Sequence, residues 1–132
     1  MRRAGKETRG FTLIEMMIVI SLILVLISIA VPMYNRAILR AKESTLRQDL
    51  FTLRDTIQQY TLDKQKAPQT LDDLKQAGYI RDIPKDPFTG DTNWTLDMED
   101  ALIAVDQQEP GIYDVHSSSN LTAQDGTAYS SW

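Results

Sequence analysis

One acidic side chain stands at the head of a long apolar run. After Glu15, no charged residue appears until Arg36. A carboxylate this close to hydrocarbon is costly unless it finds a positive partner, so its position indicates an ion-pairing site. The chemistry that these residues predict is charge pairing at the end of a hydrophobic segment, and the rest of the sequence must supply the partner.

The segment that positions Glu15 is long and apolar enough to cross a membrane. Residues 16–35 carry no charge, and at about 1.5 Å per helical residue they span about 30 Å, the thickness of a bilayer's hydrocarbon. Basic residues precede it at positions 2, 3, 6 and 9. The positive-inside rule therefore predicts a single-pass membrane protein, with residues 1–9 in the cytoplasm and the chain after Arg36 exported.

Residues 9–15 read Arg-Gly-Phe-Thr-Leu-Ile-Glu. This stretch, with the basic residues before it and the apolar run after it, resembles the processing site of the type IV pilin-like family. The resemblance implies that a prepilin peptidase cuts between Gly10 and Phe11 and methylates the new Phe11 amine. It also implies that Glu15 pairs with the Phe11 amine of a neighbouring subunit, which would fix the register of a filament because a misplaced subunit leaves buried charges unpaired.

Two other interpretations of Glu15 stay open. Phe11 and Glu15 are four residues apart, about one helical turn, so some pairing within one chain is possible. Alternatively, Glu15 is a hydrated side chain at the level of the lipid headgroups. Pro32, near the end of the apolar segment, removes a helical hydrogen bond and predicts a kink or a melted stretch. In the family, filaments bend or unwind around such prolines, so Pro32 is also an expected assembly residue.

The helix is predicted to continue past the membrane, from residue 12 to about 64. Its second half carries an apolar stripe at spacings of three and four, formed by Leu46, Leu50, Leu53, Ile57 and Tyr60. Pro68 then disfavours helical geometry at Ala67. A stripe of this kind could form a coiled-coil dimer, but the two or three heptads present favour packing against the chain's own globular part.

The remaining chain predicts a small α+β domain. A capping box at Thr70 and Asp73 starts a short second helix over 71–77, which Gly78 ends, and a turn-rich stretch follows to Trp94. Strands are expected at 94–98, 101–105 and 112–115. The predicted fold is a long N-terminal helix, transmembrane and then amphipathic, packed on a small antiparallel β-sheet with a short second helix.

Three regions follow from this interpretation: a cleaved basic leader (1–10), a transmembrane and assembly helix (11–35), and a periplasmic globular domain (36–132). The short helix, the Pro-x-Asp-Pro turn and the glycine turn before an aromatic resemble the soluble domain of the major pseudopilins of type II secretion. Those proteins carry a calcium site in a loop corresponding to 116–132. Here Asp125 is the only carboxylate in that stretch, with Asn120 and Ser117 as neutral oxygen donors.

A Ca²⁺ ion takes six to eight oxygens, so one carboxylate favours the other interpretation of this loop: closure by hydrogen bonds, with Tyr129 and Trp132 folded back onto the domain. No other cofactor is expected. His116, the only histidine, is predicted to lie in a loop and to make one hydrogen bond. We find no paired acid and base, metal cluster or phosphate loop in the sequence, so an enzyme is not expected.

The distribution of charge and the absence of cysteine narrow the classes of partner and of protein that the sequence predicts. The chain has no cysteine, and no lysine or arginine follows Lys85. Nine acidic residues lie between there and the C-terminus: Asp86, Asp91, Asp97, Glu99, Asp100, Asp106, Glu109, Asp114 and Asp125. Nothing there would neutralise phosphates, which excludes a nucleic-acid surface. The missing cysteines disfavour most type IV pilins, which close their C-terminal loop with a disulfide.

The function expected from the resemblance is a structural subunit of a type II secretion pseudopilus. Its partners would be further copies of itself, minor pseudopilins, the prepilin peptidase, and an inner-membrane platform with its assembly ATPase. A type IV pilin or another type IV filament subunit is the alternative. A signal-anchored periplasmic binding module is a third interpretation, which would be favoured by an uncut Gly10–Phe11 bond and a chain that stays monomeric.

Overall fold

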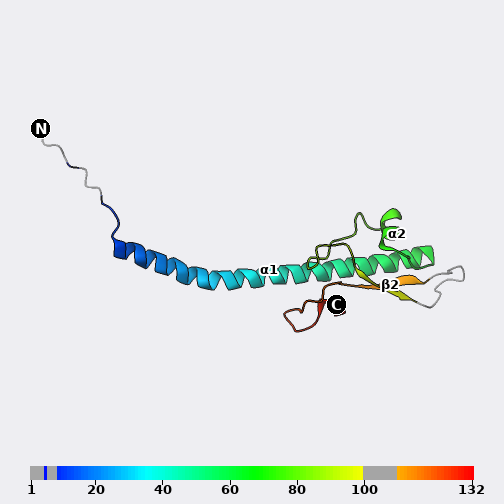
Figure 1. The fold of residues 1–132 in the computed structure, drawn as a ribbon. Helices are drawn as coiled ribbons and strands as arrows, with labels where there is room; N and C mark the ends of the chain where they lie inside the picture. The colour runs from blue at the N-terminus through cyan, green and yellow to red at the C-terminus, as the bar shows by residue number, and fades with distance from the viewer. Residues whose placement is uncertain (1–4, 6–8, 100–109) are drawn as a thin grey trace. The chain divides into compact units, whose positions relative to one another are not determined.

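A computed structural model of the chain describes Gly5 and residues 9–99 and 110–132. In chain order the elements are α1 (Leu13–Lys64), α2 (Leu71–Gln76), β1 (Thr95–Glu99), β2 (Gly111–His116) and a short 3-10 helix, η1 (Tyr129–Ser131) (Figure 1). The long helix, the short helix and the antiparallel strand pair confirm the predicted α+β fold. The chain divides into two compact units, the first ending at Leu39 and the second running from Arg40 to Trp132.

The bounds of α1 follow from local chemistry at its two ends. Thr12 precedes the helix, and its Oγ1 accepts a hydrogen bond from the Glu15 backbone N–H at 3.2 Å, as an N-cap side chain does. At the other end, Gln65 adopts a left-handed conformation with φ 57°, which stops helical propagation. The helix predicted from residue 12 to about 64 is therefore confirmed.

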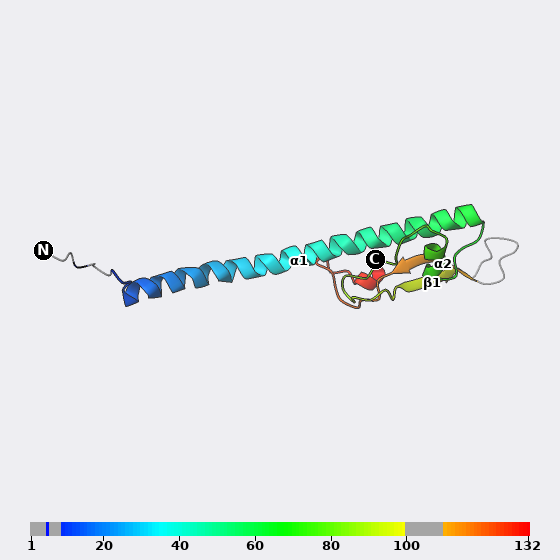
Figure 2. The same cartoon turned by 90° about the horizontal axis from the view of Figure 1, so that it is seen from above.

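The second half of α1 contributes the largest share of the hydrophobic core. The predicted stripe of Leu46, Leu50, Leu53, Ile57 and Tyr60 is buried. Around it pack residues from α2, the strands and the C-terminal segment: Leu71, Leu74, Trp94, Ile112, Val115, Ala123 and Tyr129. The two views of the fold show the strand pair lying beside this part of α1 (Figures 1 and 2). The stripe is covered by the chain's own domain rather than by a coiled-coil partner, as predicted.

The short helix α2 starts and stops where the sequence indicates. Thr70 Oγ1 accepts from the Asp73 backbone N–H at 3.3 Å, and Asp73 Oδ2 accepts from the Thr70 N–H at 3.0 Å, which completes the capping box. Gly78 follows the C-cap with φ 85°, a conformation that glycine adopts without strain. The turn-rich stretch after it is built around the buried Asp86, which accepts hydrogen bonds from the Phe88 N–H and the Ser117 hydroxyl.

The sheet has two described strands. β1 pairs antiparallel with β2, and Asp97 lies opposite Asp114 while Thr95 lies opposite His116. A register shift follows between Asp97 and Met98. The predicted strands at 94–98 and 112–115 are confirmed: β1 begins and ends one residue later, and β2 is one residue longer at each end. The strand predicted at 101–105 lies outside the described residues. His116 ends β2, so its predicted place in a loop was wrong.

Candidate functional site: the head of the apolar helix

The peptide bond between Gly10 and Phe11 lies in a non-helical segment directly before α1, and both residues are exposed. A Cβ atom added to Gly10 would have nothing within 4 Å. Its backbone also stays out of the left-handed region, where the positive-φ glycines are Gly78, Gly90 and Gly126. Neither space nor backbone conformation in the chain itself requires glycine at position 10. Any requirement for it must therefore come from a molecule that acts on this bond.

Glu15 lies in the first turn of α1, where the unpaired backbone N–H groups give the helix end a partial positive charge. The Thr12 hydroxyl takes the backbone N–H of Glu15, and the carboxylate has no hydrogen bond or ion pair among the described residues. Between Phe11 and Asn35 it is the only Asp, Glu, Lys, Arg or His. The site is thus a single unpartnered carboxylate at the polar end of an apolar helix.

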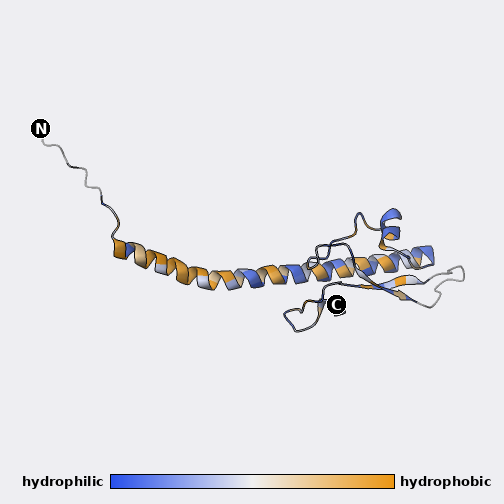
Figure 3. Cartoon of the chain, in the orientation of Figure 1, coloured by the Kyte–Doolittle hydropathy of each residue, from blue (hydrophilic) through white to orange (hydrophobic). Residues whose placement is uncertain are grey.

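The apolar half of α1 has no cover of its own. Every residue from Phe11 to Ile38 is exposed, including large side chains such as Leu13 (81%) and Leu26 (67%). Figure 3 shows this half almost uniformly hydrophobic and the second half striped. By length and composition α1 is the one helix, within the searched part of the chain, that could cross a membrane. It continues through Pro32 without a break, so no melted stretch is present in the single chain.

Two of the three residues named for calcium, Ser117 and Asp125, make other hydrogen bonds. Ser117 is buried, and its hydroxyl donates to Asp86. Asp125 accepts from both the backbone N–H and the hydroxyl of Thr127, and these bonds lower the pKa of its carboxyl group. Asn120 is exposed, and no hydrogen bond joins it to Asp125 within the described residues. Calcium binding at these three residues remains a prediction.

The C-terminal aromatic residues fold back as predicted. Tyr129 is buried and stacks on Phe88, with ring centroids 3.9 Å apart, while Trp132 meets it edge-on at 5.0 Å. Burial, followed by the hydrogen bond from the Tyr129 hydroxyl to Glu43, raises the pKa of this phenol to about 12. The Arg47 guanidinium lies 4.4 Å from the centre of the Trp132 ring. These contacts tie the end of the chain to α1.

Three features of the structure were missed in the sequence. The N-cap at Thr12 was not identified, although a threonine three residues before a glutamate is a recognisable signal. Arg54, half-exposed, donates to Asp114, to the Val115 carbonyl and to the Trp132 carbonyl. Asp97, Asp114 and His116 lie close enough together to hold a metal ion, a grouping that the sequence did not reveal. The packing of α1 against β2 sets the contacts of Arg54, the strand register sets the cluster, and no short motif encodes either.

Comparison with known proteins identifies first the class of protein to which the chain belongs and then its family. Residues 6–31 match the family model of the prokaryotic N-terminal methylation motif, which contains Gly10, Phe11 and Glu15. The chain is 32% identical to type II secretion system core protein G of Escherichia coli strain K12, over 88% of this chain and 84% of that protein. It therefore belongs to the type II secretion system core protein G family.

Further relatives extend the comparison. Core protein G of a Klebsiella michiganensis strain is 34% identical over 69% of this chain and 74% of its own length. Competence protein ComGC of Halalkalibacterium halodurans is 31% identical over 61% of this chain and 78% of its own length. No solved structure matches the chain.

Proposed function

We propose that this chain is a structural subunit of a type II secretion pseudopilus, polymerised through the apolar half of α1 to drive protein export. The observation that carries the proposal is the coincidence of three features at one point. The methylation motif, the unpartnered Glu15 carboxylate and the start of an uncovered apolar helix all lie between residues 6 and 31. In this role the chain is no enzyme, because it acts through its surfaces and its new N-terminus.

Processing is the first step. A prepilin peptidase cuts between Gly10 and Phe11, removes the leader 1–10 and methylates the Phe11 amine. The exposure of this bond and its non-helical backbone support the step, because a peptidase must bind its substrate in an open conformation. Gly10 has open space on its Cβ side, so its role is to fit the peptidase rather than the fold.

The anchored state comes next. The apolar half of α1 crosses the inner membrane as a monomer, with the basic leader in the cytoplasm and the domain 36–132 in the periplasm. The length and composition of the helix support a crossing. Hydrocarbon covers the exposed apolar side chains while the subunit waits, which explains why the chain provides no cover for them itself.

Pairing of Glu15 sets the register of assembly. Cleavage creates a positive amine at Phe11, and the Glu15 carboxylate of the incoming subunit pairs with the Phe11 amine of the subunit already in place. In a low-dielectric environment such a pair adds little net stability, but a subunit in the wrong register leaves two charges unpaired. Pro32 lies in the same apolar half, where removal of one helical hydrogen bond leaves the helix free to bend as it packs.

Filament stability comes from covering the apolar half of α1 once it leaves the bilayer. Contact with neighbouring copies stabilises the polymer by about 25 cal/mol for each Å² of apolar surface kept from water. Minor pseudopilins, an inner-membrane platform and an assembly ATPase complete the machine. A type IV pilin is the second candidate function, favoured by the likeness to type IV major fimbrial protein FimA of Dichelobacter nodosus, which is 39% identical over 46% of this chain and 38% of its own length. A fibre at the cell surface with unimpaired secretion would identify that alternative.

The test compares two glycines of the leader. Gly5 and Gly10 both have nothing within 4 Å of an added Cβ atom, so valine at either position leaves the fold unstrained. In cells that express the peptidase, the purified wild-type chain should begin at a methylated Phe11. The Gly10→Val variant should keep residues 1–10, build no periplasmic filaments and fail to restore secretion in cells that lack the wild-type chain.

Gly5→Val is the matched control and should be processed and secrete like the wild type. The readouts are the intact mass of the purified chain and the secreted fraction of a cargo protein. A wild-type chain that begins at Met1 contradicts the proposal, and so does a Gly10→Val variant that keeps its leader and still builds filaments.

A further inference from the structure

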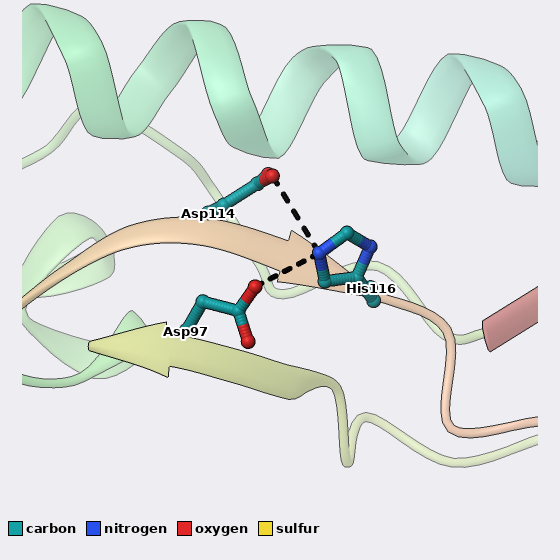
Figure 4. A group of neighbouring side chains, drawn as sticks. All are labelled: Asp97, Asp114 and His116. Carbon is teal, nitrogen blue, oxygen red and sulfur yellow. Dashed lines mark hydrogen bonds and ion pairs between the residues drawn. The ribbon is translucent and has the colours of Figure 1, made fainter. Parts of the chain in front are cut away.

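A cluster of two carboxylates and the only histidine lies on the strand pair, far along the sequence from the assembly segment. Asp97 comes from β1, and Asp114 and His116 come from β2, with one ligand atom of each within 4.8 Å of the others. Figure 4 shows both carboxylates directed at the same ring nitrogen. His116 Nε2 lies 3.0 Å from Asp97 Oδ2 and 3.5 Å from Asp114 Oδ2.

The strand register brings like charges together. Asp97 and Asp114 are direct partners across the antiparallel pair, so their side chains leave the same face of the sheet. Two carboxylates in this position repel each other and destabilise the pairing unless a positive charge lies between them. Of the two carboxylates, Arg54 contacts that of Asp114 and does so at Oδ1, at 2.6 Å, which leaves Asp114 Oδ2 facing His116. The charge that compensates Asp97 must lie at or beside His116 Nε2.

The other ring nitrogen restricts the state of His116. Nδ1 lies 2.7 Å from the main-chain oxygen of Trp132, which accepts a hydrogen bond. Nδ1 therefore carries a hydrogen. The neutral ring then directs its Nε2 lone pair at two carboxylate oxygens, so that three electron-rich atoms converge. A cation at the centre of this group, either a proton on Nε2 or a metal ion, would stabilise it.

We propose that Asp97, Asp114 and His116 bind a divalent cation of the zinc class. Ligands 2.0–2.1 Å from a tetrahedral zinc ion lie about 3.3 Å from one another. The two separations from Nε2, 3.0 and 3.5 Å, bracket that value. One nitrogen and two carboxylate oxygens suit zinc, whereas calcium and magnesium prefer shells made of oxygen alone. The partial exposure of all three side chains leaves a fourth position for water.

The surrounding contacts match those of established metal sites. A histidine that ligates through one nitrogen usually donates its other N–H to a carbonyl or carboxylate, as His116 does to Trp132. Arg54 holds the second oxygen of Asp114 and also donates to the Trp132 carbonyl at 2.5 Å. A bound ion would therefore join β1, β2 and the C-terminal residue to α1. This site differs from the calcium prediction at Asp125, which involves other residues.

The test uses the full chain in detergent micelles, purified without a polyhistidine tag and stripped with a chelator. Titration with zinc chloride by calorimetry should show one ion per chain. Asp97→Asn and His116→Gln should each weaken zinc binding by at least tenfold, since each removes a ligand. Asp125→Asn, which removes the acid named for calcium, is the matched control and should bind zinc like the wild type.

Because His116 is the only histidine, its ring nitrogens give unambiguous NMR signals. Zinc should shift Nε2 strongly and leave Nδ1 protonated. Circular dichroism identifies any variant that fails to fold, and the Asp97→Asn variant keeps the test decisive if His116→Gln is unstable. Absence of zinc binding, equal binding by all variants, or ligation through Nδ1 would each overturn the proposal. The measurement needs no filament, so its outcome is independent of the proposed function.

Discussion

The two halves of α1 carry the same kinds of apolar side chain but differ in what covers them. In the second half Leu53 is completely buried, whereas Leu24 in the first half is 60% exposed. Apolar residues of the second half recur every three or four positions, with charged residues between them. The first half is apolar around its whole circumference (Figure 3).

Periodicity explains the difference. A stripe on one side of a helix can be covered by a single small domain, and the strands, α2 and the C-terminal segment supply that cover here. A helix that is apolar on every side needs surroundings on every side, which lipid or several neighbouring helices provide. The second half of α1 therefore carries the pattern that packs against the domain. The first half carries the pattern that suits a membrane or a bundle of neighbouring helices.

The strongest test of this comparison is a pair of leucine truncations. Leu53→Ala should lower the free energy of unfolding of the domain by about 2–5 kcal/mol, because it leaves a cavity in the core. Leu24→Ala should leave this quantity unchanged, because Leu24 is 60% exposed and is not one of the core residues. Urea unfolding in micelles, followed by the fluorescence of Trp94 and Trp132, measures both. Equal losses in the two variants would contradict the division of α1.

A smaller effect is expected from the two helix caps. Thr70→Ala removes the cap of α2, and should lower the free energy of unfolding of the domain by about 1 kcal/mol. Thr12→Ala removes an equivalent bond, from the Glu15 N–H to Thr12 Oγ1, but at the head of α1. The same unfolding measurement should show no loss for Thr12→Ala. A loss for Thr12→Ala as large as that for Thr70→Ala would show that the two units are energetically coupled.

Features encoded within one helical turn were predictable from the sequence. The bounds of α1, its buried stripe and the Thr70–Asp73 capping box depend on residues three or four positions apart, and all three predictions were confirmed. The processing motif at residues 9–15 was also recognisable, because its residues are consecutive in the sequence. Cleavage at Gly10 and the pairing of Glu15 stay predictions, since both depend on a second molecule.

Features that depend on strand register could not be predicted. His116 was assigned to a loop because it borders a run of serines, yet it ends β2 and makes contacts on both ring nitrogens. Asp97 and His116 come together because the strand register sets Asp97 opposite Asp114 and Thr95 opposite His116. Nineteen positions separate them in the chain, and no local spacing marks the pair.

The most direct test of the assembly proposal replaces Glu15 with glutamine, which removes the charge of the side chain and keeps its shape. Glu15→Gln should leave peptidase cleavage and the folded domain intact, and should abolish periplasmic filaments counted by electron microscopy. Asp72→Asn, an equal loss of charge at an exposed position of the domain, should assemble like the wild type. Normal filaments from a correctly processed Glu15→Gln chain would contradict the claim that this carboxylate sets the register of assembly.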